Sequence, residues 1–403
     1  MENVKQKAEW SKKYSPITGA STIILQLIIY AVLLAPALSA QIARSIPAPD
    51  IDVASYILIE QSSGDVLAEK KADERVEPAS ITKIMTSYVA GQALKEGLIS
   101  LDDQVVVSTK AWKMGGSKMF IEAGKKVTVD QLLDGIIIQS GNDASVALAE
   151  HIAGTEKTFA ILMNDYAKKL GMLGSSFSNA SGYPDAETYV TARDVAILSR
   201  ALIRDFPAIY ERYSEPDYTF NKIKQPNRNR LLSYDPTVDG IKTGHTEKAG
   251  YCLAASANRQ GMRLVSVTMG ASSDGMRVES SRALLNYGYR FFARERFHSA
   301  GEFISEGRVW GGDMESVRIA AATDVVAIIP RGSAESVSSE LRLNKPLMAP
   351  LEVGQEIGYL ALLMDGEEFR RFPLVTLDAV NEGSVISSLW DKANLLFETV
   401  FDL

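Results

Sequence analysis

Residues 78–83 read Pro-Ala-Ser-Ile-Thr-Lys and place Ser80 three positions before Lys83. A proline and small residues ahead of an apolar stripe that begins at Ile81 predict the start of a helix. In a first helical turn, unpaired backbone N–H groups and the positive end of the dipole stabilise developing negative charge. Lys83 returns to the same face, within reach of the Ser80 hydroxyl. We expect burial and cationic neighbours to lower the pKa of Lys83, so that its neutral amine activates Ser80.

Two further motifs follow in order along the chain, Ser-Gly-Asn at 140–142 and Lys-Thr-Gly at 242–244. Alone, the first pair could be a helix cap beside a solvated lysine, and Ser-Gly-Asn could be a simple turn. Together the three motifs supply the groups needed for acyl transfer through a serine ester, without a histidine base. We expect Ser140 and Asn142 to lie on a loop, where the Ser140 hydroxyl relays a proton and the Asn142 amide holds a substrate carbonyl.

The third motif is predicted to end an edge strand and to bind the substrate through Lys242, Thr243, Gly244 and the following His245. Gly244 lets a substrate backbone approach closely, and Lys242 supplies positive charge. We expect the backbone N–H of His245 to form an oxyanion hole with that of Ser80. The side chain of His245 is left open between a structural and a catalytic role, because the sequence shows no aspartate paired with it.

These residues resemble the serine D-alanyl-D-alanine carboxypeptidases, the low-molecular-mass penicillin-binding proteins of the penicillin-binding protein 5/6 type. The resemblance runs from about Pro47 to the C-terminus and is carried by the segments Ala54–Ile59, Pro78–Ser80, Gln139–Ala144 and Val238–Thr246. It implies removal of the terminal D-alanine from peptidoglycan stem peptides that end in D-Ala-D-Ala, with β-lactams as covalent inhibitors. By the same resemblance, Arg228 and Arg277 lie near the C-terminal carboxylate of the substrate. An arginine suits that role because its fork binds a carboxylate bidentately, and surface charge is the alternative for each.

Two other functions stay open at this point. A class A β-lactamase shares the Ser-x-x-Lys and Lys-Thr-Gly motifs, but it needs an added glutamate to activate the deacylating water. No Glu-x-x-Leu-Asn segment follows Asn142. A non-catalytic scaffold of the cell envelope is the second alternative, and the intact motifs argue against it. Covalent labelling by penicillin distinguishes this scaffold from an enzyme.

Composition argues against several other classes of function. The 403 residues carry a formal net charge of −7, the pI is near 5.3, and no basic run suits nucleic acid as a partner. The single cysteine, Cys252, cannot form an intramolecular disulfide and is predicted to be a buried strand residue. With three histidines and no Cys-x-x-Cys or His-Glu-x-x-His pattern, we expect no metal site and no cofactor.

Residues 1–40 are predicted to be a signal peptide. Lysines precede an apolar run from Ile23 to Leu38, and Ala-Leu-Ser-Ala at 37–40 suits cleavage by a signal peptidase. An uncleaved anchor is the alternative, because the apolar run approaches the length of a membrane span. In either case we expect the rest of the chain to be exported, to the periplasmic face of a bacterial inner membrane.

Residues 41–298 are predicted to form the catalytic domain. Its expected strands lie early and late, at 55–61, 66–68, 251–257 and 264–269. Helical patterns dominate from Ile81 to about Leu202, and another helix is expected near 278–292. This order predicts an α+β fold, an antiparallel sheet flanked by helices. The resemblance implies the β-lactamase/transpeptidase-like version of that fold.

Residues 299–380 are predicted to form a small all-β domain, from short β-type runs that include one at 325–329. Residues 381–403 are predicted to be an amphipathic helix that binds a membrane surface, with docking on the β domain as the alternative. Apolar side chains recur there at helical spacing, at Ile386, Leu389, Trp390, Ala393, Leu396, Phe397, Val400 and Phe401. Asp391, Glu398 and Asp402 outnumber Lys392 there, so anchoring would depend on apolar burial rather than on attraction to anionic lipid.

Overall fold

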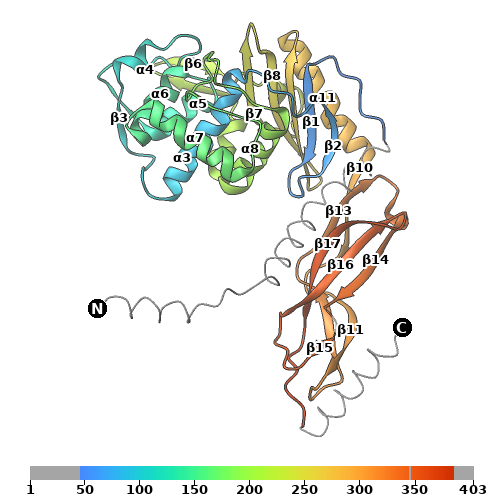
Figure 1. Ribbon diagram of the computed structural model, residues 1–403. Helices are drawn as coiled ribbons and strands as arrows, with labels where there is room; N and C mark the ends of the chain where they lie inside the picture. The colour runs from blue at the N-terminus through green and yellow to red at the C-terminus, as the bar shows by residue number, and fades with distance from the viewer. Residues whose placement is uncertain (1–45, 345, 385–403) are drawn as a thin grey trace, which may run out of the picture. The chain divides into compact units, whose positions relative to one another are not determined.

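The computed structural model describes residues 46–344 and 346–384, and their contacts define two units (Figure 1). The first unit contains the described residues up to Ser299 together with Asp324–Glu335. The second contains Ala300–Thr323 with the described residues from Ser336 onward. The predicted signal peptide and nearly all of the predicted tail helix lie outside the described residues. Within the described part of the chain, no helix is long and apolar enough to cross a membrane.

A five-stranded antiparallel sheet forms the centre of the first unit, in the order β2-β1-β9-β8-β7. Its strands are β1 (Ser55–Glu60), β2 (Val66–Lys70), β7 (Val238–Thr246), β8 (Gly250–Arg259) and β9 (Met262–Ala271). The pairing of β1 with β9 brings the beginning and the end of this unit together in the sheet. Because β7 pairs with β8 alone, it forms one edge, as the sequence predicts for the third motif.

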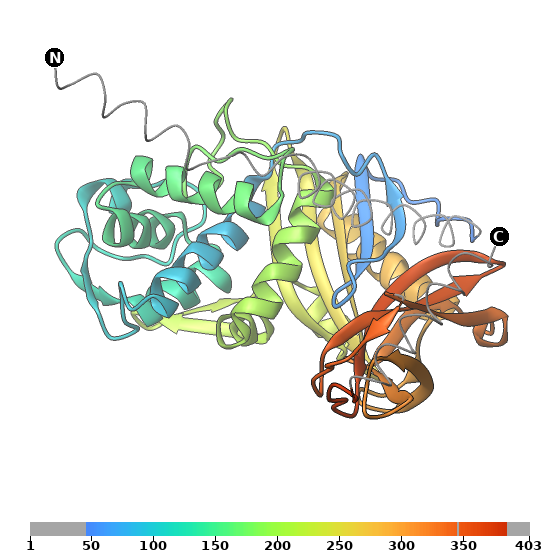
Figure 2. The same cartoon turned by 60° about the horizontal axis from the view of Figure 1, so that its bottom comes forward.

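Helices cover both faces of this sheet (Figures 1 and 2). Side chains alternate between the faces of a strand. On β1, Ile57 faces a core shared with α3 (Lys83–Lys95) and α8 (Ala192–Asp205), whereas Leu58 faces α11 (Asp274–Phe291) on the other side. The predicted α+β arrangement, an antiparallel sheet flanked by helices, is therefore confirmed.

A helical region beside the sheet carries the second motif. It is built from α4 (Thr109–Lys113), α5 (Val129–Ile137), α6 (Asn142–Ala153) and α7 (Glu156–Leu170). A capping box begins α5: the Thr128 hydroxyl accepts from the Gln131 N–H, and the Gln131 side chain accepts from the Thr128 N–H. Leu132 and Ile136 of α5 are completely buried in the core of this region, as their helical spacing requires.

Several short elements of the first unit show no periodic pattern in the sequence and were not predicted. The short helical elements are η2 (Ala79–Thr82), α9 (Pro207–Glu211), η3 (Arg212–Ser214) and α10 (Leu231–Tyr234). The two-stranded pairs are β3 (Gln104–Val106) with β4 (Lys126–Thr128), and β5 (Asp217–Phe220) with β6 (Ile223–Pro226). Helices dominate from Ile81 to Leu202 as expected, and the first of these pairs is a short addition that the sequence did not predict. Strands of three residues are too short to show a period of two.

The run predicted at 325–329 forms β13 (Val325–Pro330), and the contacts of the chain group it with the first unit. It pairs antiparallel with β10 (Phe292–His298), and its Ala327 and Ile329 are buried. The boundaries of the predicted β domain, 299–380, stay a prediction.

A six-stranded sheet forms the second unit, in the order β14-β16-β17-β12-β11-β15. Its strands are β11 (Phe303–Trp310), β12 (Ser316–Ala321), β14 (Val337–Leu343), β15 (Leu347–Met348), β16 (Glu356–Met364) and β17 (Glu367–Thr376), and η4 (Ala334–Ser336) precedes β14. Neighbouring strands are antiparallel except for the short pair of β11 and β15. Leu360, Leu362 and Leu374 are completely buried in this sheet. The predicted C-terminal all-β domain is therefore present.

Candidate active site

The Ser80–Lys83 pair lies where η2 meets α3. Ala79 has a left-handed backbone (φ +48°), and the chain then turns through η2 rather than directly into an α-helix. Lys83 is the first residue of α3, and its side chain is completely buried. Its Nζ lies 2.9 Å from Ser80 Oγ, so the structure brings the amine and the hydroxyl within hydrogen-bond distance.

Three oxygen atoms surround the Lys83 amine. Besides Ser80 Oγ, Nζ lies 2.7 Å from Asn142 Oδ1 and 2.6 Å from Ser181 O. A carbonyl oxygen can only accept a hydrogen bond, whereas a hydroxyl can donate or accept one. A neutral amine at this position therefore donates its two protons to Asn142 and Ser181 and turns its lone pair toward Ser80. This arrangement suits proton transfer from the hydroxyl to the amine.

The protonation of Lys83 is set by its surroundings. Burial lowers the pKa of Lys83 to about 7, and the negative charge of Asp143 partly opposes this shift. Burial also holds the pKa of Lys242 well below its usual value, and the positive charges of Lys83, Arg277 and Arg228 add to that shift. The expected effect of cationic neighbours is thus corrected, because it falls on Lys242 rather than on Lys83. Near neutral pH, much of Lys83 is the neutral amine that a general base requires.

The second motif leads into α6. Ser140 has a left-handed backbone (φ +67°), and its buried Oγ has no hydrogen-bond partner among the described residues. Asn142 begins α6, which corrects the expectation that it lies on a loop. One N–H of its amide donates to Gly115 O at 2.7 Å, and its oxygen faces Lys83. Asn142 therefore orients the Lys83 amine. Only the second N–H of its amide is available to donate to a substrate carbonyl.

Asp143, whose role was not predicted from the sequence, holds the backbone of residues 119 and 120 against the start of α6. Its buried carboxylate accepts the backbone N–H groups of Met119, Phe120 and Ala144 at 2.8 to 2.9 Å. The available signal was an acidic residue in a first helical turn, which is ordinarily explained by the helix dipole alone. In the structure the same charge also favours the ammonium form of Lys83.

The third motif lies on β7, where Lys242 and Thr243 are almost completely buried. Gly244 packs against the turn that leads to Ser80, because a Cβ added there would lie 2.8 Å from Pro78 O. Glycine therefore allows β7 to approach η2 closely. The sequence predicted a close approach of a substrate backbone at this glycine, whereas in the structure the backbone of the protein itself lies there.

A cavity of about 660 Å³ next to β7 contains the two arginines that the resemblance implies, Arg228 and Arg277. The rings of His245 and Tyr251, tilted by 31° with centroids 4.0 Å apart, form part of its lining. Arg228 is exposed, whereas Arg277 is nearly buried and donates from Nη1 to Gly244 O at 3.1 Å. The structure thus brings both arginines to one cavity, and their contact with a substrate carboxylate stays a prediction.

Comparison with known proteins connects this geometry to a family. Residues 42–273 match the family model described as D-alanyl-D-alanine carboxypeptidase. The chain belongs to this family. Residues 292–382 match a second model, described as the C-terminal domain of penicillin-binding protein 5.

Individual carboxypeptidases and penicillin-binding proteins are similar over much of the chain. The D-alanyl-D-alanine carboxypeptidase DacC of Escherichia coli (strain K12) is 43% identical over 367 residues, which cover 89% of this chain and 92% of that protein. The structure of penicillin binding protein 5 from Haemophilus influenzae gives a TM-score of 0.78 at 43% identity and covers 84% of this chain and 100% of its own. Penicillin-binding protein D2 from Listeria monocytogenes, in its ampicillin-bound form, gives a TM-score of 0.56 at 28% identity, with coverages of 60% and 100%.

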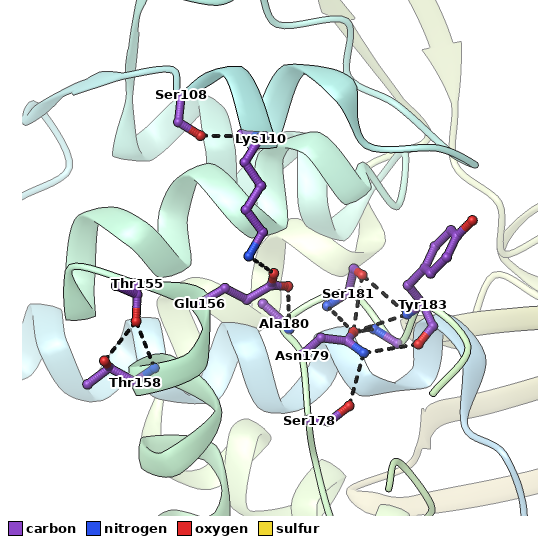
Figure 3. A network of polar contacts seen from close by, with 12 residues as sticks. Ser108, Lys110, Thr155, Glu156, Thr158, Ser178, Asn179, Ala180, Ser181 and Tyr183 are labelled. Carbon is purple, nitrogen blue, oxygen red and sulfur yellow. Dashed lines mark hydrogen bonds and ion pairs between the residues drawn. The ribbon is translucent and has the colours of Figure 1, made fainter. Parts of the chain in front are cut away.

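In this carboxypeptidase, the Ser181 carbonyl near Lys83 is carried by the loop 178–183, which the sequence analysis also missed (Figure 3). Asn179 Oδ1 accepts three backbone N–H groups of the loop at distances between 2.8 and 3.2 Å. A Cβ added at Gly182 would lie 1.8 Å from Ala79 O, so the loop packs directly on η2. A backbone carbonyl has no signature in the sequence, and only the folded loop reveals this contact.

The loop is hydrogen-bonded to Glu156, whose carboxylate also forms an ion pair between two helices (Figure 3). Glu156, the first residue of α7, accepts from the Ala180 N–H at 3.1 Å and pairs with Lys110 of α4 at 2.7 Å. Thr86 of α3 donates its hydroxyl to Ala180 O at 2.6 Å. These contacts fix both polar groups of Ala180 and thereby place the adjacent Ser181 carbonyl.

Replacing Glu156 tests whether this loop orients the amine. We expect Glu156→Ala to slow acylation by penicillin roughly ten- to a hundredfold, because small displacements of reacting groups are costly. A looser loop also admits water to Lys83 and raises its pKa, so half-maximal acylation should move to higher pH. Lys157→Ala, at the exposed neighbouring position, is the control and should change neither quantity. An unchanged rate and pH profile in Glu156→Ala would show that the loop does not orient the amine.

Cys252 lies outside the set of reactive groups described above. Cys252 lies on β8 and is completely buried, as the sequence predicts. Burial raises the pKa of its thiol to about 11, so the thiolate is scarce at neutral pH. Among the described residues, no group of three or more histidine, cysteine, aspartate or glutamate side chains could hold a metal ion.

Proposed function

We propose that this D-alanyl-D-alanine carboxypeptidase acts through an acyl-enzyme on Ser80. The proposal rests on the buried amine of Lys83, which lies 2.9 Å from Ser80 Oγ and has a pKa of about 7. Its substrate is a peptidoglycan stem peptide that ends in D-Ala-D-Ala, and β-lactams acylate the same serine.

The first half of the reaction forms the ester. The neutral Lys83 amine accepts the Ser80 proton while Oγ attacks the carbonyl carbon of the penultimate D-alanine. The backbone N–H groups of Ser80 and His245 stabilise the oxyanion that develops. As the C–N bond breaks, the Lys83 ammonium passes its proton through the Ser140 hydroxyl to the leaving nitrogen. D-alanine departs, and Lys83 is a neutral amine again.

The second half of the reaction hydrolyses the ester. Water attacks the acyl carbon and loses a proton to the Lys83 amine. As the ester C–O bond breaks, the Lys83 ammonium protonates Ser80 Oγ and restores the hydroxyl. During both halves, Asn142 and Thr243 bind the peptide backbone. Lys242, with Arg228 and Arg277, supplies the positive charge that attracts the terminal carboxylate of the substrate.

Mass spectrometry of the intact protein tests this assignment. With penicillin, we expect a mass increment of one penicillin molecule that maps to the peptide containing Ser80. With a pentapeptide that ends in D-Ala-D-Ala, we expect one D-alanine released from each peptide. A β-lactamase would turn over penicillin without retaining it, and a scaffold would carry out neither reaction. An adduct on another residue would refute the role of Ser80.

We infer further that the chain is exported and is held at the periplasmic face of the inner membrane by residues 381–403. The inference is supported by the sequence: a basic and then apolar segment at the N-terminus, and apolar residues at helical spacing from Ile386 to Phe401. Burial of each apolar side chain in the lipid boundary would contribute roughly 1–2 kcal/mol before ordering costs.

A shortened chain of residues 41–382 tests the attachment. We expect it to be recovered without detergent and to release D-alanine, whereas residues 41–403 should float with anionic lipid vesicles. Binding should persist or rise at high salt, because salt screens the repulsion between anionic lipid and Asp391, Glu398 and Asp402. Release by salt alone contradicts an apolar anchor. Equal flotation of the two chains places the membrane contact elsewhere.

A further inference from the structure

The guanidinium of Arg277 contacts the backbone at the end of the third motif. Arg277 lies in the first turn of α11, and its side chain is nearly buried. Its Nη1 donates to Gly244 O at 3.1 Å and lies 3.4 Å from the carbonyl oxygen of Cys252, which pairs with Gly244 on β8. These two contacts have no part in attracting the terminal carboxylate of a substrate, so they call for a separate explanation.

The peptide bond between Gly244 and His245 connects this contact to the oxyanion hole. The bond is trans, and in a planar trans peptide the C=O and the following N–H point in opposite directions. Because Gly244 O points toward Arg277 and β8, the His245 N–H points toward the free edge of β7. A charge-assisted hydrogen bond to the carbonyl fixes the plane of this peptide and polarises it, which strengthens its N–H as a donor.

Asp274 holds the guanidinium in this position. Its Oδ1 accepts from Arg277 Nη2, and its Oδ2 accepts from Arg230 Nη1 at 3.0 Å. The hydroxyl of Ser273 caps α11 by accepting the Met276 N–H at 3.1 Å, so the ion pair belongs to a well-defined helix start. Burial lowers the pKa of Arg277, and the negative charge of Asp274 opposes this shift. One side of the guanidinium is therefore bound to a carboxylate while the other side donates to the sheet.

We propose that Asp274 is a positioning residue for the oxyanion hole. Through Arg277 it fixes the peptide bond whose N–H, that of His245, binds the developing oxyanion. The inference rests on the proposed function, because the attack of Ser80 creates the charge that this N–H stabilises. Removal of a whole oxyanion-hole donor costs roughly 10²- to 10³-fold in kcat. A donor that remains but is held less firmly should cost less.

A different role for Asp274 makes a different prediction. Asp274, Arg277 and Arg228 line the same cavity, in which the proposed function places the terminal carboxylate of the substrate. If Asp274 acted on that carboxylate alone, its loss would change the reaction of substrates that carry the carboxylate and of no others. An acyl donor without the carboxylate therefore distinguishes this role from the positioning of the oxyanion hole.

Two acyl donors test the proposal with the full-length chain in detergent. Acetyl-L-Lys-D-Ala-D-Ala carries the terminal carboxylate, and the benzyl thioester of acetyl-L-Lys-D-Ala does not. We expect Asp274→Ala to lower kcat/KM about tenfold for both donors. Asp274→Asn keeps a neutral acceptor for Arg277 and should lose less. Glu279→Ala, which removes an exposed carboxylate of the same helix, is the control and should change neither value.

The infrared spectrum of the acyl-enzyme separates positioning from a general loss of structure. Hydrogen bonds in an oxyanion hole lower the stretching frequency of the ester carbonyl that they bind. With penicillin on Ser80, we expect this frequency to be higher in Asp274→Ala than in the wild-type chain. Partial unfolding would instead reduce the amount of adduct and leave the frequency of the remaining adduct unchanged.

The outcomes distinguish the inference from the proposed function. An unchanged carbonyl frequency in Asp274→Ala, or a loss confined to the donor with the carboxylate, would overturn the role of Asp274 and leave the proposed function intact. If the wild-type chain cleaved neither donor, the proposed function would fail and the inference with it. Should Asp274→Ala not fold, Asp274→Asn provides the second test, and wild-type kcat/KM and frequency in that variant would also overturn the role.

Discussion

Ser80→Ala abolishes both D-alanine release and the penicillin adduct, if Ser80 is the nucleophile that we propose. The substitution removes the oxygen that bonds to the acyl group, and loss of a nucleophile typically lowers kcat by about four to six orders of magnitude. The fold should survive, because the exchange removes one hydroxyl at a half-exposed position. Stopped-flow acylation by penicillin and a D-alanine assay measure the two losses.

Ser199→Ala is the matched control for this experiment. Ser199 is a buried serine of α8 whose hydroxyl donates to Val195 O, outside the candidate site. Its replacement should leave both reactions close to their wild-type rates. A penicillin-sized mass increment on the Ser80→Ala protein would mean that another side chain is the nucleophile.

Lys83→Arg is expected to lose nearly all acylation while it keeps a positive charge at the site. Arginine cannot become a neutral base in a protein, and general base catalysis is worth roughly 10²- to 10⁴-fold in rate. Circular dichroism and a thermal melt should show whether the variant remains folded. Acylation at the wild-type rate would point to another base, with the exposed His245 as the first candidate.

The pH profile of the wild-type enzyme provides an independent measure of the same base. Because burial lowers the pKa of Lys83 to about 7, the reactive neutral amine predominates above that pH and is lost below it. Acylation should therefore fall by about tenfold for each pH unit below 7. Residual activity in Lys83→Arg should not show this decline below pH 7. A wild-type rate that is constant from pH 5 to 8 would contradict the role of Lys83 as the base.

Much of the sheet and the core of the site could be predicted from the sequence, because the deciding signals are local. The spacing of Ser80 and Lys83 fixes their distance within a single turn, whatever the rest of the chain does. The strands at β1, β8 and β9 were predicted because their apolar runs are long and bounded by turn residues. The edge position of the third motif followed from its sequence and its resemblance to the family, not from an apolar run.

The features that the sequence did not reveal depend on contacts between distant segments. The Ser181 carbonyl reaches Lys83 across 98 positions of the chain, and a carbonyl is common to all residues. Asp143 resembles an ordinary charge at a helix start until its backbone partners at 119 and 120 are seen. In the same way, the pairing of β13 with β10 was not predicted, because an alternating pattern does not identify the partner of a strand.

Glycines 182 and 244 enclose the Ser80 turn from two sides, and this limits how the enzyme could evolve antibiotic resistance. A mutation that excludes a bulky inhibitor must add atoms near the serine. At Gly182 an added Cβ would lie 1.8 Å from Ala79 O, and at Gly244 it would lie 2.8 Å from Pro78 O. Either change would displace the serine that the cell-wall substrate also needs. Escape mutations compatible with survival are therefore expected at the exposed rim, at positions such as Ile223, rather than at these two glycines.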